Sequence, residues 1–97
     1  MIYCFDVDGT ICTQEEDYSS AQPFLDRIEQ INFLYDEGHK ITFYTARGYL
    51  TGIDWSEITK NQFEEWGVKY HSLVFGKPNA DVYIDDKSSD PFSWFKQ

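Results

Sequence analysis

The sequence predicts an α/β fold in which a mainly parallel sheet is flanked by helices. Short apolar runs typical of buried strands alternate with stretches whose apolar residues recur at helical spacing, and each run ends in a polar residue. This alternation implies right-handed crossovers and therefore parallel strands. Ligands bind such sheets at the carboxyl ends of the strands, so we expect these polar residues to converge at one edge.

The first strand is predicted over residues 2–7, a continuous apolar run that only Asp6 interrupts. Such a run is typical of a strand buried on both faces, and we expect Asp6 at its end. Gly9 then permits a turn, the polar stretch 13–22 predicts a loop, and Pro23 suits the first turn of a helix.

The first helix is predicted to run from there to Gly38, a natural terminator. Its apolar residues recur at three- and four-residue spacing, which predicts one buried and one exposed face. The buried face is expected to hold Phe24, Leu25, Ile28, Ile31, Leu34 and Tyr35, and the exposed face Asp26, Arg27, Glu29, Gln30 and Asp36.

Three further strands are predicted over residues 41–45, 73–75 and 82–84, with a loop through Gly48 and Gly52 after the first of them.

A second helix is predicted between the strands at 41–45 and 73–75. Asp54 and Glu57 resemble a capping box at its start, and Gly67 marks its end. Its apolar stripe is expected to be Ile58, Phe63 and Trp66.

Length and composition indicate one domain over residues 1–97, without room for a separate substrate-binding domain. Seventeen acidic against eight basic side chains give a formal charge of −9, which disfavours non-specific binding of nucleic acid or an anionic membrane. No run approaches the roughly 18 apolar residues of a membrane span, and the first residues lack a secretory pattern, so we expect a cytoplasmic protein. Cys4 and Cys12 lack a CxxC spacing and are expected to be reduced thiols.

Four polar residues end the four apolar runs: Asp6, Thr45, Lys77 and Asp85. Asp6 is followed two residues later by Asp8, a spacing that lets one carboxylate attack a phosphoryl group while the other handles a proton. Thr45 and Lys77 would meet the charge on the phosphate oxygens.

An anionic phosphate beside this acidic cluster requires a hard cation, and Mg²⁺ prefers a few carboxylates together with water and phosphate oxygens. Asp85, helped by Asp86 or Asp90, is expected to supply the carboxylate that the first strand does not.

Four ordered motifs resemble those of the haloacid dehalogenase superfamily, and together they cover nearly the whole chain. They are Asp6–Thr10, Tyr44–Arg47, Gly76–Pro78, and Tyr83–Asp86 with Asp90. The resemblance implies a Rossmann-like fold. Because family members usually carry a cap domain for which this chain has little space, it also implies a capless site that is open unless a neighbouring subunit of a homo-oligomer covers it.

The resemblance also implies roles for individual residues. Asp6 would be the nucleophile, Asp8 the acid and base, and Thr45 and Lys77 the phosphate ligands. Mg²⁺ would be held by Asp6, the Asp8 carbonyl group and the fourth motif, where Asp85 and Asp86 are both candidate ligands. An Asp at position 8 favours phosphatase over dehalogenase chemistry.

Several residues have two interpretations. Arg47 binds the substrate or pairs with an acidic neighbour; Tyr49, Leu50 and Ile53 form a rim to the substrate pocket or cover the core. His39 and His71 are expected to be surface or core residues rather than catalysts. The aromatic tail over residues 91–95 should pack on the domain or on a second subunit.

The predicted function is Mg²⁺-dependent hydrolysis of a small phosphorylated metabolite, such as a sugar or polyol phosphate. The resemblance to short capless members linked to surface-polysaccharide pathways points the same way, by analogy alone. A polynucleotide or protein phosphatase is an alternative, since an open site admits large substrates. A non-catalytic phospho-receiver or binding module is another.

Overall fold

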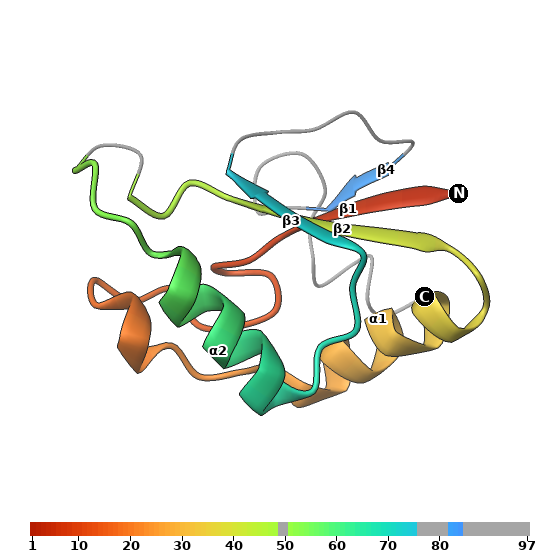
Figure 1. Ribbon diagram of the computed structural model, residues 1–97. Helices are drawn as coiled ribbons and strands as arrows, with labels where there is room; N and C mark the ends of the chain where they lie inside the picture. The colour runs from red at the N-terminus through yellow and green to blue at the C-terminus, as the bar shows by residue number, and fades with distance from the viewer. Residues whose placement is uncertain (49–50, 76–81, 85–97) are drawn as a thin grey trace.

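The computed structural model describes residues 1–48, 51–75 and 82–84. These residues form a parallel sheet of four strands, in the order β3-β2-β1-β4, with both α-helices on the same side of it in Figure 1. The parallel α/β fold is thus as the sequence predicts. The strands are β1 (Ile2–Asp6), β2 (Lys40–Thr45), β3 (Ser72–Phe75) and β4 (Val82–Ile84), and the helices are α1 (Leu25–Asp36), α2 (Ser56–Trp66) and the short 3₁₀ helix η1 (Tyr18–Ser20).

The two central strands, β1 and β2, are buried on both faces. Cys4 and Phe5 are consecutive residues of β1, so their side chains point to opposite faces, and both are fully buried. In β2 every residue from Ile41 to Thr45 is buried. The continuous apolar runs in the sequence therefore correspond to strands without a solvent-exposed face.

Helix α1 begins at Leu25, so Pro23 lies before the helix, in a bridge to Cys12, rather than in its first turn. The two faces of the helix follow the prediction except at two positions. Leu25, expected in the core, is 64% exposed, whereas Arg27, expected on the outer face, is only 6% exposed. The Arg27 guanidinium group donates to the Thr10 carbonyl oxygen at 2.8 Å and lies over the Phe24 ring. The turn after β1 thus supplies the acceptor that keeps this arginine inside.

Helix α2 begins later than the predicted capping box and buries a different face. The Asp54 carboxylate accepts from the Ser56 backbone N–H at 2.9 Å, and Glu57 already lies in the first turn. Ile58 is 37% exposed, while Phe63 is buried together with the polar residues Thr59 and Gln62. The predicted apolar stripe is therefore wrong at Ile58, because two polar side chains share the inner face.

The register of the sheet brings the carboxyl ends of the strands together. Asp6, the last residue of β1, pairs with Tyr44, so that Thr45 at the end of β2 lies one position further along. β4 ends at Ile84, which pairs with Phe5. Convergence of polar residues at this edge is thus seen for Asp6 and Thr45.

The two histidines lie at the opposite, amino-terminal edge. His71 Nδ1 accepts from the Ile41 backbone N–H at 3.0 Å, and its ring stacks on Tyr35. The His39 ring meets Tyr3 edge to face. Both therefore have structural contacts remote from the carboxyl edge.

Among the described residues, no helix has the length and apolar character needed to cross a lipid bilayer.

Candidate active site

A tight turn after β1 positions the two aspartates. The Val7 carbonyl oxygen accepts backbone N–H bonds from Thr10 at 3.2 Å and Ile11 at 3.0 Å. Gly9, with φ at +82°, lets the chain reverse there at no steric cost. Asp6 and Asp8 are both half-buried as a result, one at the strand end and one in the turn.

Asp8 forms a bidentate ion pair with Arg47. Arg47 Nε donates to Asp8 Oδ2 at 3.0 Å and Nη2 donates to Oδ1 at 2.8 Å. The Arg47 side chain is fully buried and that of Asp8 is 14% exposed. Two parallel charge-assisted bonds fix the orientation of the carboxylate as well as its position.

The remaining Arg47 donors are also satisfied within the chain. Nη1 donates to Thr59 Oγ1 at 3.0 Å and to Gln62 Oε1 at 2.7 Å, and Nη2 has a weak contact with Cys12 Sγ at 3.9 Å. A guanidinium group has five N–H donors, and these contacts with the two to Asp8 engage all of them. Of its two interpretations, Arg47 is seen here in the ion pair, and its role as a substrate ligand stays a prediction.

The segment 13–22 is tied to the same arginine. The Tyr18 ring lies 4.9 Å from the Arg47 guanidinium carbon, and Gln62 Nε2 donates to the Tyr18 carbonyl oxygen at 2.7 Å. The ends of the segment are joined by the Thr13 N–H, which donates to the Gln22 carbonyl oxygen. This closed loop therefore packs over Arg47 rather than extending away from the site.

Thr45 presents a hydroxyl group suited to binding an anion. The side chain is 2% exposed, and its Oγ1 accepts from the Arg47 backbone N–H at 3.1 Å. Within the described ranges, no acceptor is found for its own O–H proton. The hydroxyl group is thus able to donate to a phosphate oxygen.

Asp8 keeps one acceptor position. Oδ1 accepts from Arg47 and lies 3.6 Å from Cys12 Sγ, whereas Oδ2 accepts only the Arg47 Nε–H bond among the described residues. A carboxylate oxygen has two lone pairs, so Oδ2 retains one that can carry a proton. Burial, followed by the charge of Asp8, raises the Cys12 pKa to about 12, which makes this cysteine a neutral thiol rather than a nucleophile.

Several predicted residues lie outside the described part of the chain: Lys77, Asp85, Asp86, Asp90, Tyr49, Leu50 and the tail 91–95. Within the described part, no cluster of three or more His, Cys, Asp or Glu side chains is arranged to hold a metal. The oxygen donors that are described fit Mg²⁺ in kind, since Asp6 offers a carboxylate at the strand end and Asp8 a backbone carbonyl group.

Four residues around Arg47 were not anticipated from the sequence: Tyr18, Thr59, Gln62 and Cys12. A signal for two of them was present. Thr59 lies four residues before Phe63 and Gln62 four residues before Trp66, so these polar residues share the helix face that carries the apolar residues.

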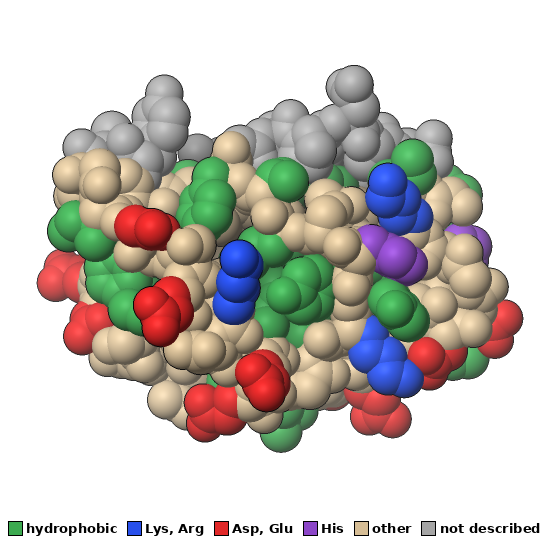
Figure 2. Space-filling model, in the orientation of Figure 1, with side chains coloured by type: hydrophobic (Ala, Val, Ile, Leu, Met, Phe, Trp, Pro, Cys, Tyr) green, Lys and Arg blue, Asp and Glu red, His purple; other side chains and the backbone are tan. Residues whose placement is uncertain are grey.

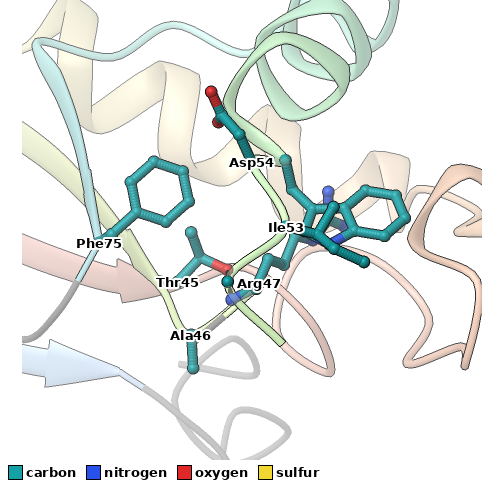
Figure 3. Close-up of a pocket in the computed structure, with 9 residues that line it drawn as sticks. Thr45, Ala46, Arg47, Ile53, Asp54 and Phe75 are labelled. Atoms are coloured by element: carbon teal, nitrogen blue, oxygen red, sulfur yellow. Dashed lines mark hydrogen bonds between the residues drawn. The ribbon is translucent and has the colours of Figure 1, made fainter. Parts of the chain in front are cut away.

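Two cavities open beside this edge. The smaller, of about 220 Å³, is lined in part by Thr45, Asp54 and Phe75; in Figure 3, Thr45 lies between Phe75 and the segment that carries Ile53. The larger, of about 570 Å³, lies against segment 13–22. They share the walls Ala46, Gly48, Ile53 and Trp55.

Comparison with solved structures identifies similar folds. The chain is similar to the crystal structure of a target protein from Vibrio cholerae, with 28% identity and a TM-score of 0.79, over 100% of this chain and 89% of that one. It is also similar to a chain in the structure of the Pnkp1/Rnl/Hen1 complex, with 16% identity and a TM-score of 0.63, over 91% of this chain but only 30% of that one. The second likeness concerns the fold alone. No family model and no curated protein matches the sequence.

Proposed function

We propose that this chain is a capless, Mg²⁺-dependent phosphatase of the haloacid dehalogenase superfamily that hydrolyses a small phosphate monoester. The observation that carries the proposal is the position of Asp6 and Thr45 on neighbouring strand ends, with Asp8 held in the adjoining turn by Arg47. The residues that we propose as nucleophile, as hydrogen-bond donor to the phosphate and as proton carrier thus lie on neighbouring segments at the edge where parallel sheets bind ligands.

The first half of the reaction forms a covalent intermediate. An Asp6 oxygen attacks phosphorus, and the bond from phosphorus to the ester oxygen breaks. The departing alkoxide takes a proton from Asp8, which leaves an aspartyl phosphate and a free alcohol. The Thr45 hydroxyl group would donate to a phosphoryl oxygen as charge builds on it.

The second half returns the enzyme to its starting state. Asp8 removes a proton from water as the water oxygen attacks phosphorus, and the bond to Asp6 breaks to release inorganic phosphate. The lone pair that remains on Asp8 Oδ2 is the position for this shuttling proton. Arg47 acts through Asp8 and is therefore a positioning residue.

Mg²⁺ held by Asp6, the Asp8 carbonyl group and Asp85 or Asp86 would offset the repulsion between the substrate and these carboxylates. A formal charge of −9 supports a substrate with one phosphate group over a polyanion, since Arg47 is already neutralised by Asp8.

The proposal is tested by assaying the purified chain with Mg²⁺ against small phosphate monoesters. Asp6→Asn is expected to abolish turnover, at least 10³-fold, without unfolding the protein, because the amide is nearly isosteric with the carboxylate but a poor nucleophile. Asp26→Asn, at an exposed position of α1, is the matched control and should retain full activity. Substantial hydrolysis by folded Asp6→Asn would overturn the mechanism.

Two further measurements separate the alternatives. Phosphorylated protein that persists for minutes to hours with Mg²⁺ present would indicate a phospho-receiver instead of a phosphatase. Sugar and polyol phosphates are expected to have a higher kcat/KM than 3′- and 5′-phosphorylated oligonucleotides at low and moderate salt. A tenfold advantage for an oligonucleotide would replace the small-molecule assignment by a polynucleotide phosphatase.

A further inference from the structure

The larger cavity has the size and lining of a small-molecule site. Its volume of about 570 Å³ falls within the roughly 300–1,000 Å³ typical of ligand pockets. The apolar part of its wall is formed by Tyr18, Ile53 and Trp55, and polar groups are contributed by Glu16 and Thr51. An apolar wall with a few polar groups is the usual composition of such pockets.

The aromatic part of the wall is rigid. The rings of Tyr18 and Trp55 meet edge to face, with centroids 4.9 Å apart and planes at 90°. Tyr18 is also held by the Arg47 guanidinium group, 4.9 Å from its ring centroid, and by the hydrogen bond from Gln62 to its carbonyl oxygen. A preorganised aromatic surface binds the apolar face of a ring with little loss of side-chain entropy.

The cavity wall is in contact with residues of the proposed active site. Arg47 contacts both Asp8, the proposed proton donor to the leaving oxygen, and Tyr18 in the cavity wall. Ala46, also in the wall, directly follows Thr45. The cavity is therefore close enough to receive the alcohol group of an ester whose phosphate is bound at Asp6 and Thr45.

The cavity is bordered by negative charge. Glu16 lines it, and Asp54 lines the smaller cavity that shares Ile53 and Trp55. Hydrogen bonds from Ser56 lower the pKa of Asp54, which is fully ionised at neutral pH. Figure 2 shows further acidic side chains, with a few Lys and Arg side chains between them, on the face that carries α2. A second anionic group on the substrate would be repelled, whereas hydroxyl groups find acceptors in Glu16 and Thr51.

From this arrangement we propose that the cavity lined by Glu16, Tyr18, Ile53 and Trp55 is the leaving-group pocket, and that it selects an uncharged alcohol with a ring, such as a pyranose or furanose sugar. The inference rests on the proposed function, which it narrows from any small monoester to a cyclic one whose phosphate is its only anionic group. Tyr18, Ile53 and Trp55 would contact the ring, and Glu16 would exclude a carboxylate or second phosphate.

The test uses two matched substrate pairs with the full chain and Mg²⁺. Glucose 6-phosphate against glucitol 6-phosphate compares a mainly cyclic with an acyclic alcohol of the same carbon number. Glucose 1-phosphate against glucuronic acid 1-phosphate adds one carboxylate to the same ring. The expected result is a kcat/KM at least tenfold higher for the first member of each pair.

Two variants address the residues responsible. Ile53 is 56% exposed, so Ile53→Ala should fold normally, and it is expected to lower the cyclic-to-acyclic ratio of kcat/KM about fivefold. Glu16→Gln is expected to raise the ratio of kcat/KM for glucuronic acid 1-phosphate to that for glucose 1-phosphate at least threefold. Leu25→Ala is the control: Leu25 is an exposed residue of α1 that lies outside the pocket, and loss of its similar aliphatic side chain should change neither ratio.

The outcomes separate the inference from the function on which it rests. If neither the four sugar and polyol esters nor p-nitrophenyl phosphate are hydrolysed with Mg²⁺, the proposed function fails. If they are hydrolysed in an Asp6-dependent reaction, but both substrate ratios are near one and unaffected by Ile53→Ala and Glu16→Gln, the function stands and the pocket assignment is overturned.

Discussion

The ion pair between Asp8 and Arg47 should contribute strongly to the stability of the fold, and its strength can be measured by a double-mutant cycle. Arg47→Met keeps much of the side-chain length and removes the guanidinium group, and Asp8→Asn removes the opposite charge. Because the two side chains are 0% and 14% exposed, each single change leaves a largely buried charge without its partner. Breaking a buried pair in this way costs about 3–5 kcal/mol.

The slight exposure of Asp8 favours the lower end of this range for Arg47→Met, since water can reach the abandoned carboxylate. The double variant leaves no unpaired charge, so we expect a coupling energy of roughly 2–3 kcal/mol. In a domain of 97 residues, each kcal/mol corresponds to a Tm change of about 4–8 °C.

Free energies of unfolding are to be measured in urea at pH 7 with EDTA, so that metal binding does not enter the cycle. The exposed pair of Asp36 and Lys69 is a matched control: its N–O distance is also 2.8 Å, but the side chains are 56% and 49% exposed. Such pairs contribute about 0.2–1 kcal/mol. A coupling energy below about 0.5 kcal/mol for Asp8 and Arg47, no larger than that of the control, would refute the buried bidentate pair.

Three other predictions follow from the site. EDTA should abolish hydrolysis and Mg²⁺ restore it, with Asp85→Ala raising the half-maximal Mg²⁺ concentration at least tenfold; full activity without metal would contradict this. Cys4 and Cys12 are buried, and the Cys12 pKa is raised to about 12, so at pH 8 a thiol reagent should label the protein only after unfolding; rapid native labelling would contradict the burial. Gly48→Ala places a Cβ in a severe clash with the Ile53 carbonyl oxygen, whereas the Cβ of Gly52→Ala, also at positive φ, meets nothing within 4 Å. Backbone strain should lower the free energy of unfolding of both variants by about 1 kcal/mol. The clash should destabilise Gly48→Ala clearly further, as measured by thermal denaturation, and equal losses of stability in the two variants would contradict the steric argument.

The Cys12 shift also sets a direction for stability against pH. The folded pKa lies above the ordinary value of the unfolded thiol, about 8.5, so the unfolded chain loses this proton first as the pH rises. The contribution of the neutral thiol to the free energy of unfolding is complete below about pH 8.5. It declines as the pH rises from there to the pKa of the folded state.

The strands and the polar residues at their ends were predictable because they depend on local patterns. The run at 2–7 contains too many apolar residues for a strand with a solvent-exposed face, and residues 41–45 are all β-branched or aromatic. The structure places both strands at the centre of the sheet. Parallel pairing then brings Asp6 and Thr45 to one edge whatever the details of packing. The outer limits of these strands differ from the prediction by a single residue, as expected where pairing ends.

The burial of charged residues was not predictable in the same way. Helical spacing assigns Arg27 to the outer face, but a long side chain can turn inward when a buried carbonyl group, here that of Thr10, accepts a hydrogen bond from it. Two of the acceptors of Arg47 come from α2, twelve and fifteen residues further along the chain, and the carboxylate of Asp8 comes from the turn after β1. Such contacts depend on how segments far apart in the sequence pack together, and the periodicity within one segment does not predict them.

The contacts of Arg47 also bear on how substrate selection and chemistry are connected. One guanidinium group holds Asp8 in place, and it is itself held by Gln62 and covered by the Tyr18 ring. Tyr18 forms part of the proposed pocket wall, so an alcohol group that fits the pocket contacts a residue that packs on Arg47, the partner of the proposed proton carrier Asp8. Because Asp8 is already fixed by Arg47, a poorly fitting alcohol would hold its ester oxygen less accurately against this carboxyl group. We therefore expect discrimination between cyclic and acyclic esters to be seen in kcat as well as in KM, because alignment of the leaving oxygen with the acid affects the chemical step and not binding alone.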